Sequence, residues 1–358
     1  MTEFAIRPMI VPASLADADA ADFIAMCELV NRSTEVVLGT DDFSLAPAER
    51  LPYAADPARL RVNFVATSGS SVVGWGGYEA QRGNDVRECW IDVHVDAAHR
   101  NRGIGSALLH KLIDTAATDD KSQVNTRMFA STGRAGPRVA AASGHGTLAA
   151  DDAGFVFARG REFVLEQVAQ INRLALPVDA AVLAERREGA TVGYGDDYEL
   201  LHWSGPTPEV YLDDIARLFT EMSTADPHGN LDVSEDVWDA DRIREADDRE
   251  RNSPRTKLTA TARHRASGTL VAFTTLDVPP ARTRPVNQWA TMVSGAHRGR
   301  RLGLAVKLEN LAQLIDEFPG HPSITTINAE ENAAMIAVNR SVGFVTVGHG
   351  GILRRHLD

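Results

Sequence analysis

The sequence has 358 residues, which is enough for about two domains of ordinary size. Hydrophobic residues make up 44% of the chain and charged residues 24%, a profile typical of a globular protein. The net charge is −12, and this acidic excess argues against nucleic-acid binding, which needs a basic surface. The charge is compatible with a cationic substrate, although acidity is also common among soluble enzymes.

Neither a membrane anchor nor a disulfide framework is expected. The apolar runs are far too short to span a bilayer, and residues 1–7 do not have the pattern of a signal peptide. Only two cysteines occur, Cys27 and Cys89, so we expect no disulfide framework and no bound metal. These features predict a cytoplasmic protein that exists as a monomer or a homodimer.

In chain order, the first half begins with an amphipathic helix, whose apolar residues recur at helical spacing over 23–30. Two β-rich runs follow at 62–67 and 71–78, separated by a short Ser-Gly-Ser segment that predicts a hairpin. An alternating strand at 90–95 then leads through a glycine-containing loop at 100–105 into a helix with an apolar stripe.

The second half repeats this order. An amphipathic helix is predicted over 211–222, and β-rich runs at 258–264 and 270–276 read as a second hairpin. A strand at 289–293 then leads into a second glycine-containing loop at 298–303 and another helix.

The two halves are predicted to be tandem copies of one α/β domain, over residues 1–180 and 181–358. Arg298 of the second loop lies 198 residues after Arg100 of the first. A Gly-Phe pair follows each loop, Gly154-Phe155 in the first half and Gly343-Phe344 in the second. Ordered elements at a nearly constant offset are the signature of an internal repeat.

The first loop has the composition of a phosphate-binding turn. Glycines let backbone N–H groups approach a phosphate closely, and the N-terminus of the following helix adds positive potential. An arginine at a helix start opposes the helix dipole, so an anionic partner is expected there. We therefore predict a diphosphate-bearing cofactor, bound by Arg100, Asn101, Arg102, Gly103, Ile104, Gly105 and Ser106.

The stretch from Val95 to Gly105 resembles the signature of the GNAT N-acetyltransferase superfamily, in which a strand ending in Val precedes Arg-x-x-Gly-x-Gly/Ala and a helix. Residues 325–344 are similar to the later GNAT motif, a short helix that ends at Gly-Phe beneath the pantetheine arm. The second loop resembles the signature less well, because Arg301 stands where the first glycine belongs. The resemblance covers nearly the whole chain, and it implies two tandem GNAT-like domains, each a central mixed β-sheet flanked by helices.

This resemblance implies acetyl transfer from acetyl-CoA to a primary amine of a small molecule or peptide, by direct attack of the amine on the thioester. The thioester oxygen needs a donor as it gains charge, and the family supplies a backbone N–H of the strand, here near Val93 to Val95.

In the second half the resemblance implies cofactor contacts at Val293, Arg298 and Gly303. Asn332 and Asn339 lie seven residues apart, on one face of the expected helix, where they are placed to hydrogen-bond the pantetheine amides.

A general base is expected on the strand before the first loop. Alternate side chains of a strand share a face, so Asp92 and His94 lie on one face and the apolar residues of 91–95 lie on the other. The imidazole of His94 titrates near neutral pH, and Glu88 stands at the strand start, where many family members keep a carboxylate base. We therefore expect His94 or Glu88 to be catalytic, and deprotonation through water alone stays open.

The family's usual acid is missing. Many members place a tyrosine four residues before the Gly-Phe pair to protonate the leaving thiolate, but those positions hold Ala150 and Asn339 here. The first half has the better phosphate loop and the titratable strand, whereas the strand at 289–293 carries no carboxylate or imidazole. The first half is therefore favoured as the catalytic domain.

The sequence thus favours an acetyl-CoA-dependent N-acetyltransferase with a small-molecule amine as acceptor. One alternative is acetylation of a cysteinyl sugar, as in mycothiol synthase, which has a tandem architecture of this type. A second alternative is a catalytically silent acyl-CoA-binding protein, which the missing tyrosine keeps open. The motifs are specific for acyl-CoA binding and nearly silent about the acceptor.

Overall fold

The computed structural model describes residues 4–82, 86–131, 135–225 and 235–357. Contacts divide the chain into two compact units. The first consists of residues up to Val168 together with those from Gly348 onward, and the second of Ala169–Val347. Each unit has a mixed sheet flanked by helices, which confirms the predicted α/β fold class. The limits 1–180 and 181–358 stay a prediction about the extent of the repeated sequence.

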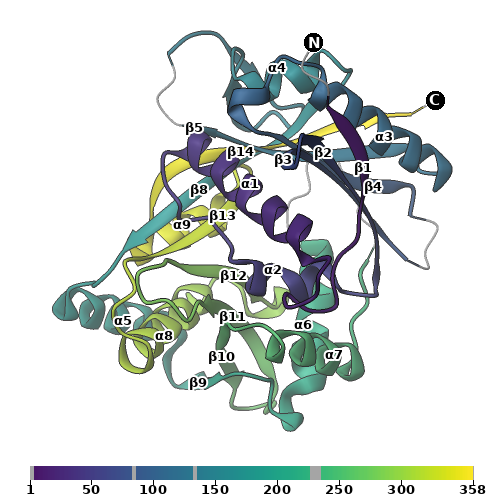
Figure 1. The fold of residues 1–358 in the computed structure, drawn as a ribbon. Helices are drawn as coiled ribbons and strands as arrows, with labels where there is room; N and C mark the ends of the chain where they lie inside the picture. Colours follow the sequence, from purple (N-terminus) through teal and green to yellow (C-terminus); the bar gives the residue numbers. More distant parts are fainter. Residues whose placement is uncertain (1–3, 83–85, 132–134, 226–234, 358) are drawn as a thin grey trace. The chain divides into compact units, whose positions relative to one another are not determined.

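The first unit begins with an edge strand and a helical pair, followed by a hairpin and a βαβ crossover (Figure 1). Its elements are β1 (Ala5–Met9), α1 (Ala20–Leu38), α2 (Pro47–Ala54), β2 (Arg59–Ser68), β3 (Ser71–Gln81), β4 (Glu88–Val95), α3 (Ile104–Thr118), β5 (Gln123–Ser131), β6 (Arg138–Ala140), β7 (Thr147–Ala149), α4 (Ala153–Arg159), the first part of β8 (Val164–Ala175) and the part of β14 (Val345–His356) from Gly348 onward.

The main sheet of this unit has the order β1-β2-β3-β4-β5-β14, and all neighbours are antiparallel except β4 and β5. The predicted hairpin is confirmed as β2–β3. The parallel pairing of β4 with β5 begins at Glu88↔Gln123 and ends at Ile91↔Thr126. Beyond these residues the two strands are no longer paired, although both continue.

Small residues of β3 let α3 approach one face of the sheet. A Cβ on Gly74 would lie 2.9 Å from the Ile104 side chain, and one on Gly76 would lie 3.2 Å from that of Leu112. Because side chains alternate along a strand, Trp75 points to the opposite face, where it packs in a buried cluster with residues of α1.

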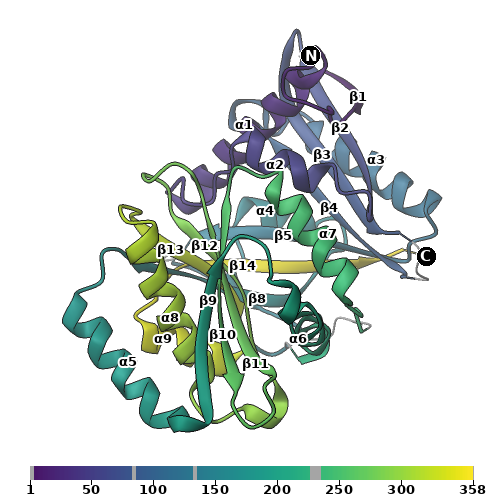
Figure 2. The same ribbon diagram turned by 90° about the horizontal axis from the view of Figure 1, so that it is seen from below.

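The second unit has the same plan. Figure 2 shows α5, α8 and α9 on one side of strands β9 to β11, with α6 and α7 on the other. Its elements are the rest of β8, α5 (Ala180–Tyr194), β9 (Tyr198–Ser204), α6 (Leu212–Ala225), α7 (Ala240–Arg251), β10 (Thr256–His264), β11 (Leu270–Val278), β12 (Val286–Val293), α8 (Leu302–Glu317), β13 (Ser323–Ala329), α9 (Ala333–Val342) and the start of β14.

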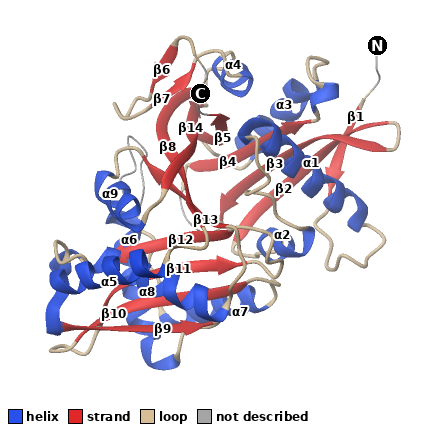
Figure 3. Ribbon diagram, turned by 90° about the vertical axis from the view of Figure 1, so that its left-hand side faces the viewer, coloured by secondary structure: helices blue, strands red, loops and turns tan. Residues whose placement is uncertain are grey.

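The sheet of the second unit has the order β8-β13-β12-β11-β10-β9, and strands β9 to β12 lie side by side in Figure 3. The predicted second hairpin is confirmed as β10–β11. Strands β12 and β13 are parallel and pair only at Val286↔Ile324 and Asn287↔Thr325. The register of β11 against β12 shifts between Thr274 and Leu276, which marks a β-bulge.

The pairing registers confirm the internal repeat. Trp75 of β3 lies opposite His94 of β4, and Phe273 of β11 lies opposite Met292 of β12. Both members of the second pair lie 198 residues after those of the first, which is also the offset between Arg100 and Arg298.

The prediction that Gly154-Phe155 follows the short helix of the first half is wrong. Gly154 and Phe155 lie in the first turn of α4, where their N–H groups are capped by the side chain of Asp152. In the second unit Gly343-Phe344 closes α9, with Gly343 at a φ of 108°.

The true counterpart of Gly343-Phe344 is Glu162-Phe163, because Glu162 has a φ of 68° and the Phe163 N–H reaches back five residues, to the carbonyl of Ala158. Phe344 bonds to the carbonyl of Asn339 in the same way. The residue that corresponds to Asn339 is therefore Ala158 rather than Ala150, and it too lacks a phenol.

Among the described residues, no helix is both long enough and apolar enough to cross a membrane.

The close approach of α3 to β3 can be tested with Gly74→Val. The added side chain has no room against Ile104, so we expect a loss of about 1–3 kcal/mol in the free energy of unfolding, the usual cost of overpacking. Urea denaturation measures the change.

Gly189→Ala is the matched control, because no atom lies within 4 Å of the new Cβ and the residue is inside helix α5. It should keep or slightly raise stability. Unchanged stability of Gly74→Val would contradict the packing described here.

Candidate functional site

The loop between β4 and α3 forms a concave arrangement of backbone. Asn101 and Gly103 both adopt left-handed conformations, with φ values of 59° and 86°. Gly103 is the N-cap residue of α3, and no side chain of the described residues caps this helix. The N–H groups of the first helical turn are therefore placed to bind an anion.

Two arginines of the loop brace its backbone. The Nε of Arg100 donates to the carbonyl of Val95 at 3.2 Å, and Arg102 donates to the carbonyl of Ala98 at 3.0 Å. Both side chains belong to exposed residues, so the loop keeps cationic groups at the surface.

A third cation, Arg161, lies at the same helix start. Its guanidinium donates to Ser106 Oγ at 2.6 Å and lies 3.8 Å from the ring centre of Phe157. A Cβ on Gly105 would meet the same ring at 3.3 Å and Val95 at 3.6 Å. Sequence reasoning missed Arg161, because its contact with the loop spans 55 residues and no motif marks it.

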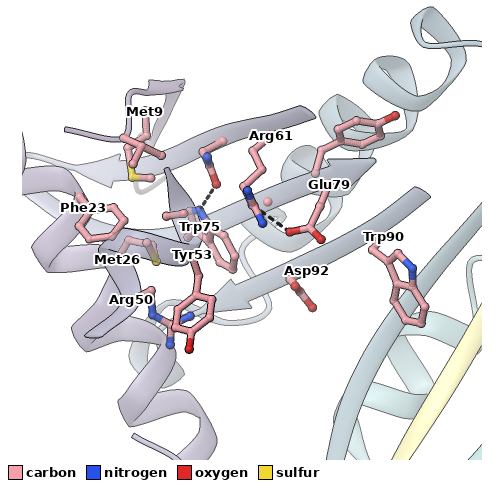
Figure 4. Close-up of a pocket in the computed structure, with 15 residues that line it drawn as sticks. Met9, Phe23, Met26, Arg50, Tyr53, Arg61, Trp75, Glu79, Trp90 and Asp92 are labelled. Atoms are coloured by element: carbon pink, nitrogen blue, oxygen red, sulfur yellow. Dashed lines mark hydrogen bonds and ion pairs between the residues drawn. The ribbon is translucent and has the colours of Figure 1, made fainter. Parts of the chain in front are cut away.

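A pocket of about 190 Å³ opens on the face of the sheet that α1 and α2 cover, beside the point where β4 leaves β5 (Figure 4). Apolar and aromatic side chains form much of its wall. Its lining residues are Met9, Val11, Phe23, Met26, Arg50, Tyr53, Ala54, Arg61, Asn63, Trp75, Gly77, Tyr78, Glu79, Trp90 and Asp92.

Asp92 is the first residue of β4 beyond the last pair with β5, and its side chain lines the pocket. Burial raises the pKa of this carboxyl, and the nearby Arg127 and Arg50 oppose the rise. Arg127 itself stacks over Trp90, 3.7 Å from the ring centre. A carboxylate with a raised pKa in a pocket is suited to accept a proton.

His94 lies on the same face as Asp92, as predicted, and contacts α1. Its Nδ1 lies 2.6 Å from Ser33 Oγ, and its ring centre lies 5.7 Å from that of Trp75. Burial lowers the pKa of His94 to about 4, with further lowering from Arg50 and Arg100. The imidazole is therefore neutral at physiological pH and only weakly basic.

Glu88 lies at the other end of β4. Its carboxylate accepts from Asn125 at 3.0 Å and from Arg354 at 3.4 Å. A strand rises about 3.3 Å per residue, so Glu88 and His94 are separated by roughly 20 Å. The structure does not bring the two expected catalytic side chains together.

The second loop has the same backbone with different residues. Arg298 Nε donates to the carbonyl of Val293 at 3.2 Å, as Arg100 does to Val95. The left-handed positions are Gly299 and Arg301, with φ values of 79° and 56°. Arg301 thus adopts the conformation that Gly103 has in the first unit.

Contacts with α5 hold Arg301 in this conformation. Its guanidinium donates to the carbonyl of Gly189 at 2.9 Å. A Cβ on Gly193 would lie only 2.7 Å from the aliphatic part of the Arg301 side chain. Gly303 packs as Gly105 does, with its Cβ position 3.5 Å from Val293.

The strand of the second unit carries no titratable group at the corresponding places. Ala290 stands where Asp92 stands, and Met292, which corresponds to His94, is buried in an apolar cluster with Phe273. The bulge is filled by side-chain hydrogen bonds: the Ala290 N–H donates to Thr275 Oγ1 at 3.3 Å.

The two asparagines of α9 have separate places. Asn332 is the N-cap residue and accepts from the Met335 N–H at 3.1 Å. Asn339 is buried, and its Nδ2 donates to Asn328 Oδ1 on β13 at 2.6 Å.

A model of the acetyltransferase (GNAT) family matches residues 23–136, which contain the first loop. The tandem GNAT protein from the clavulanic acid biosynthesis pathway, solved without acetyl-CoA, has a similar structure with a TM-score of 0.73. The two sequences are 21% identical, and the match covers 99% of this chain and 98% of that one. The chain has the tandem GNAT architecture.

Two further structures share this tandem GNAT fold. A GCN5-related N-acetyltransferase from Sphaerobacter thermophilus has a TM-score of 0.63 at 12% identity, over 99% of this chain and 95% of that one. A glucosamine N-acetyltransferase region of a fungal multi-domain beta-N-acetylglucosaminidase has a TM-score of 0.59 at 14% identity, over 99% of this chain and 38% of that one. The comparison with curated proteins gave no match.

The family model covers part of the first unit, and the solved structures show that the whole chain shares their fold. The activity of this chain and the residues that would perform it are matters for proposal.

The lowered pKa of His94 predicts a pH effect on stability. The pKa is about 4 in the folded protein against an ordinary 6.5. Between these values the unfolded chain binds a proton that the folded chain does not, so stability falls as the pH decreases from 6.5 to 4. His94→Gln removes this contribution, and its free energy of unfolding should fall less over the window. Urea denaturation at both ends of the window compares the variants, and equal losses would show that His94 titrates normally.

Proposed function

We propose that the protein is an acetyl-CoA-dependent N-acetyltransferase of small-molecule primary amines, and that the reaction takes place in the first unit. One observation about β4 carries this proposal. The strand separates from β5, lines the pocket and leads into the loop before α3, a helix that no side chain of the described residues caps. We further propose that it acts in the cytoplasm, as a monomer or a homodimer.

The residues of the first loop fit the cofactor's diphosphate. We assign phosphate binding to the N–H groups and side chains of 100–106, with Arg161 as an additional cation. Acetyl-CoA supplies the activated acetyl thioester. Beyond its pairing with β5, β4 offers backbone N–H groups near Val93 and Val95 for the thioester oxygen.

For the general base we propose Asp92 in preference to the other two titratable residues of β4. Asp92 lies in the pocket at the divergence, and burial strengthens it as a base by raising its pKa. His94 has a pKa of about 4 and serves better as a neutral group hydrogen-bonded to Ser33. Glu88 is held by Asn125 and Arg354 at the paired end of the strand.

The second unit is proposed to support the first rather than to catalyse. Its loop retains a phosphate-binding backbone through Val293, Arg298 and Gly303, so weak cofactor binding there is compatible with the structure. The Oδ1 of Asn332 and the Nδ2 of Asn339 are already engaged within the second unit, which disfavours a role for these two groups on the pantetheine arm, whereas the buried Oδ1 of Asn339 has no hydrogen-bond partner among the described residues.

Cofactor binding can be tested with the repeat as its own control. In Gly105→Asp the new carboxylate would lie in the first turn of α3, where it would repel the phosphates and compete for their N–H groups. We expect at least a tenfold loss of acetyl-CoA affinity, which is about 1.4 kcal/mol. Isothermal titration calorimetry measures it. Gly303→Asp is the matched change in the second unit and should leave the main site intact. The reverse pattern would place the cofactor in the second unit.

Catalysis can be assigned with four variants and one amine substrate. Asp92→Asn should lower turnover by roughly 10²- to 10⁴-fold, the usual effect of removing a general base, and should leave acetyl-CoA affinity unchanged. His94→Ala and Glu88→Gln should have smaller effects. Asn339→Ala in the second unit should turn over normally. If Asp92→Asn turns over normally and Asn339→Ala does not, the active site lies in the second unit. If acetyl-CoA binds and no amine is acetylated, the protein is a catalytically silent acyl-CoA-binding protein.

A further inference from the structure

Some charged side chains of the pocket form ion pairs and others do not. Arg61 donates to Glu79 at 2.9 Å, and Arg59, from outside the lining, lies 3.4 Å from the same carboxylate, so Arg61 and Glu79 already have ionic partners. Among the described residues, Arg50 and Asp92 form no ion pair with any side chain within 4 Å. The pocket therefore presents one cation and one anion that are not paired.

Arg50 comes from α2 and lies beside the thiol of Cys27. Its Nε is buried and has no hydrogen-bond partner among the described residues. A buried polar group without a partner is costly, and a bound acceptor would relieve that cost. A guanidinium in this state is suited to bind a carboxylate through two parallel hydrogen bonds.

Aromatic rings lie beside the unpaired cation of the pocket. Figure 4 shows the rings of Tyr53 and Trp75 next to Arg50, with Asp92 farther along the sheet. A ligand that spans the pocket would thus place a cation at the sheet, an apolar part along the rings and an anion at α2. The ammonium end belongs at Asp92, because that residue marks the divergence of β4 from β5 where the thioester is expected.

We propose that the acceptor is a small amine that carries a carboxylate, such as an α-amino acid with an apolar side chain, bound through its ammonium to Asp92 and through its carboxylate to Arg50. The proposal rests on the proposed acetyltransferase function. The volume of about 190 Å³ is below the roughly 300–1,000 Å³ of pockets for drug-sized ligands. Arg50 would repel polycationic amines, which counts against acceptors of that class.

The reaction balances with this acceptor and acetyl-CoA alone. The ammonium first loses a proton to Asp92, and the free amine attacks the thioester carbonyl carbon. A carbon–nitrogen bond forms, the carbon–sulfur bond breaks and its electron pair leaves with the sulfur. Of the two protons that the nitrogen gives up, one ends on the thiol and one passes from Asp92 to water. The products are an N-acetyl amino acid and coenzyme A.

The test compares leucine with leucinamide, which keeps the amine and side chain but lacks the negative charge. The ammonium of leucinamide is more acidic than that of leucine, so a larger fraction of leucinamide is free amine at a given pH. Intrinsic reactivity therefore favours leucinamide. With the wild-type protein and acetyl-CoA we expect kcat/KM for leucine to exceed that for leucinamide by about 10- to 100-fold, the scale of a hydrogen bond between charged groups.

The substitution Arg50→Met should abolish this preference, mainly by raising KM for leucine, and should leave the rate with leucinamide and the affinity for acetyl-CoA nearly unchanged. Arg50→Lys keeps the charge without the paired donors and should give an intermediate ratio. Arg61→Met is the matched control, because Arg61 lines the same pocket but is already bound to Glu79. It should change both rates together and leave their ratio as in the wild type.

The outcomes separate this inference from the proposed function. If amines are acetylated but leucinamide or a polyamine is preferred, or if Arg50→Met keeps the leucine preference, the carboxylate site is wrong and the acetyltransferase stands. If acetyl-CoA binds and no amine of either kind is acetylated, the proposed function fails and the inference fails with it. The wild-type ratio alone decides the substrate class, even where an Arg50 variant does not fold.

Discussion

Strand β4 pairs with β5 only from Glu88 to Ile91, and the chemistry proposed for the first unit depends on the point where this pairing ends. Parallel neighbours normally satisfy each other's backbone groups along their length. Where they separate, N–H and C=O groups become free for a ligand inside an otherwise closed sheet. Asp92 is the next residue along the strand, and the loop that begins after Val95 continues from the same opening. In the proposed mechanism, one local change in pairing therefore sets the positions of the base, the thioester and the phosphate together.

The two units show that this backbone does not require one set of residues. Both loops place left-handed residues two apart, but glycine takes the second position in one and the first in the other. A non-glycine residue in that conformation carries a strain of order 1 kcal/mol. In the second unit, Arg301 is held there by a hydrogen bond to Gly189 and by close packing on Gly193. Contacts with α5 thus stabilise the left-handed conformation in the second loop, whereas in the first loop Gly103 adopts it without strain.

The sequence was sufficient for features that depend on neighbours in the chain. Hairpins, the loop and its helix follow from periodicity and glycine placement, and all lie where predicted. The closing pair of the first unit was misplaced, because Glu162 adopts a left-handed conformation that residue type does not predict. The strand face of His94 was predictable, but its pKa was not, since burial by distant helices sets it. The contact of Arg161 with the loop has the same origin, as does the lack of a hydrogen-bond partner for Arg50 Nε among the described residues.

The proposed catalytic role of the first unit also explains why the corresponding face of the second unit carries apolar side chains. In the second unit the place of His94 is filled by Met292. The ring of Phe219 stacks on Trp238 and is tilted against Phe273, with ring centres 4.9 Å apart in both pairs. This packing occupies the face that forms the pocket in the first unit. An apolar core stabilises a domain, whereas a pocket with unpaired charges costs stability unless a ligand occupies it. The proposed division is therefore physical: one unit keeps the costly polar face that the proposed chemistry needs, and the other fills the corresponding face with apolar core.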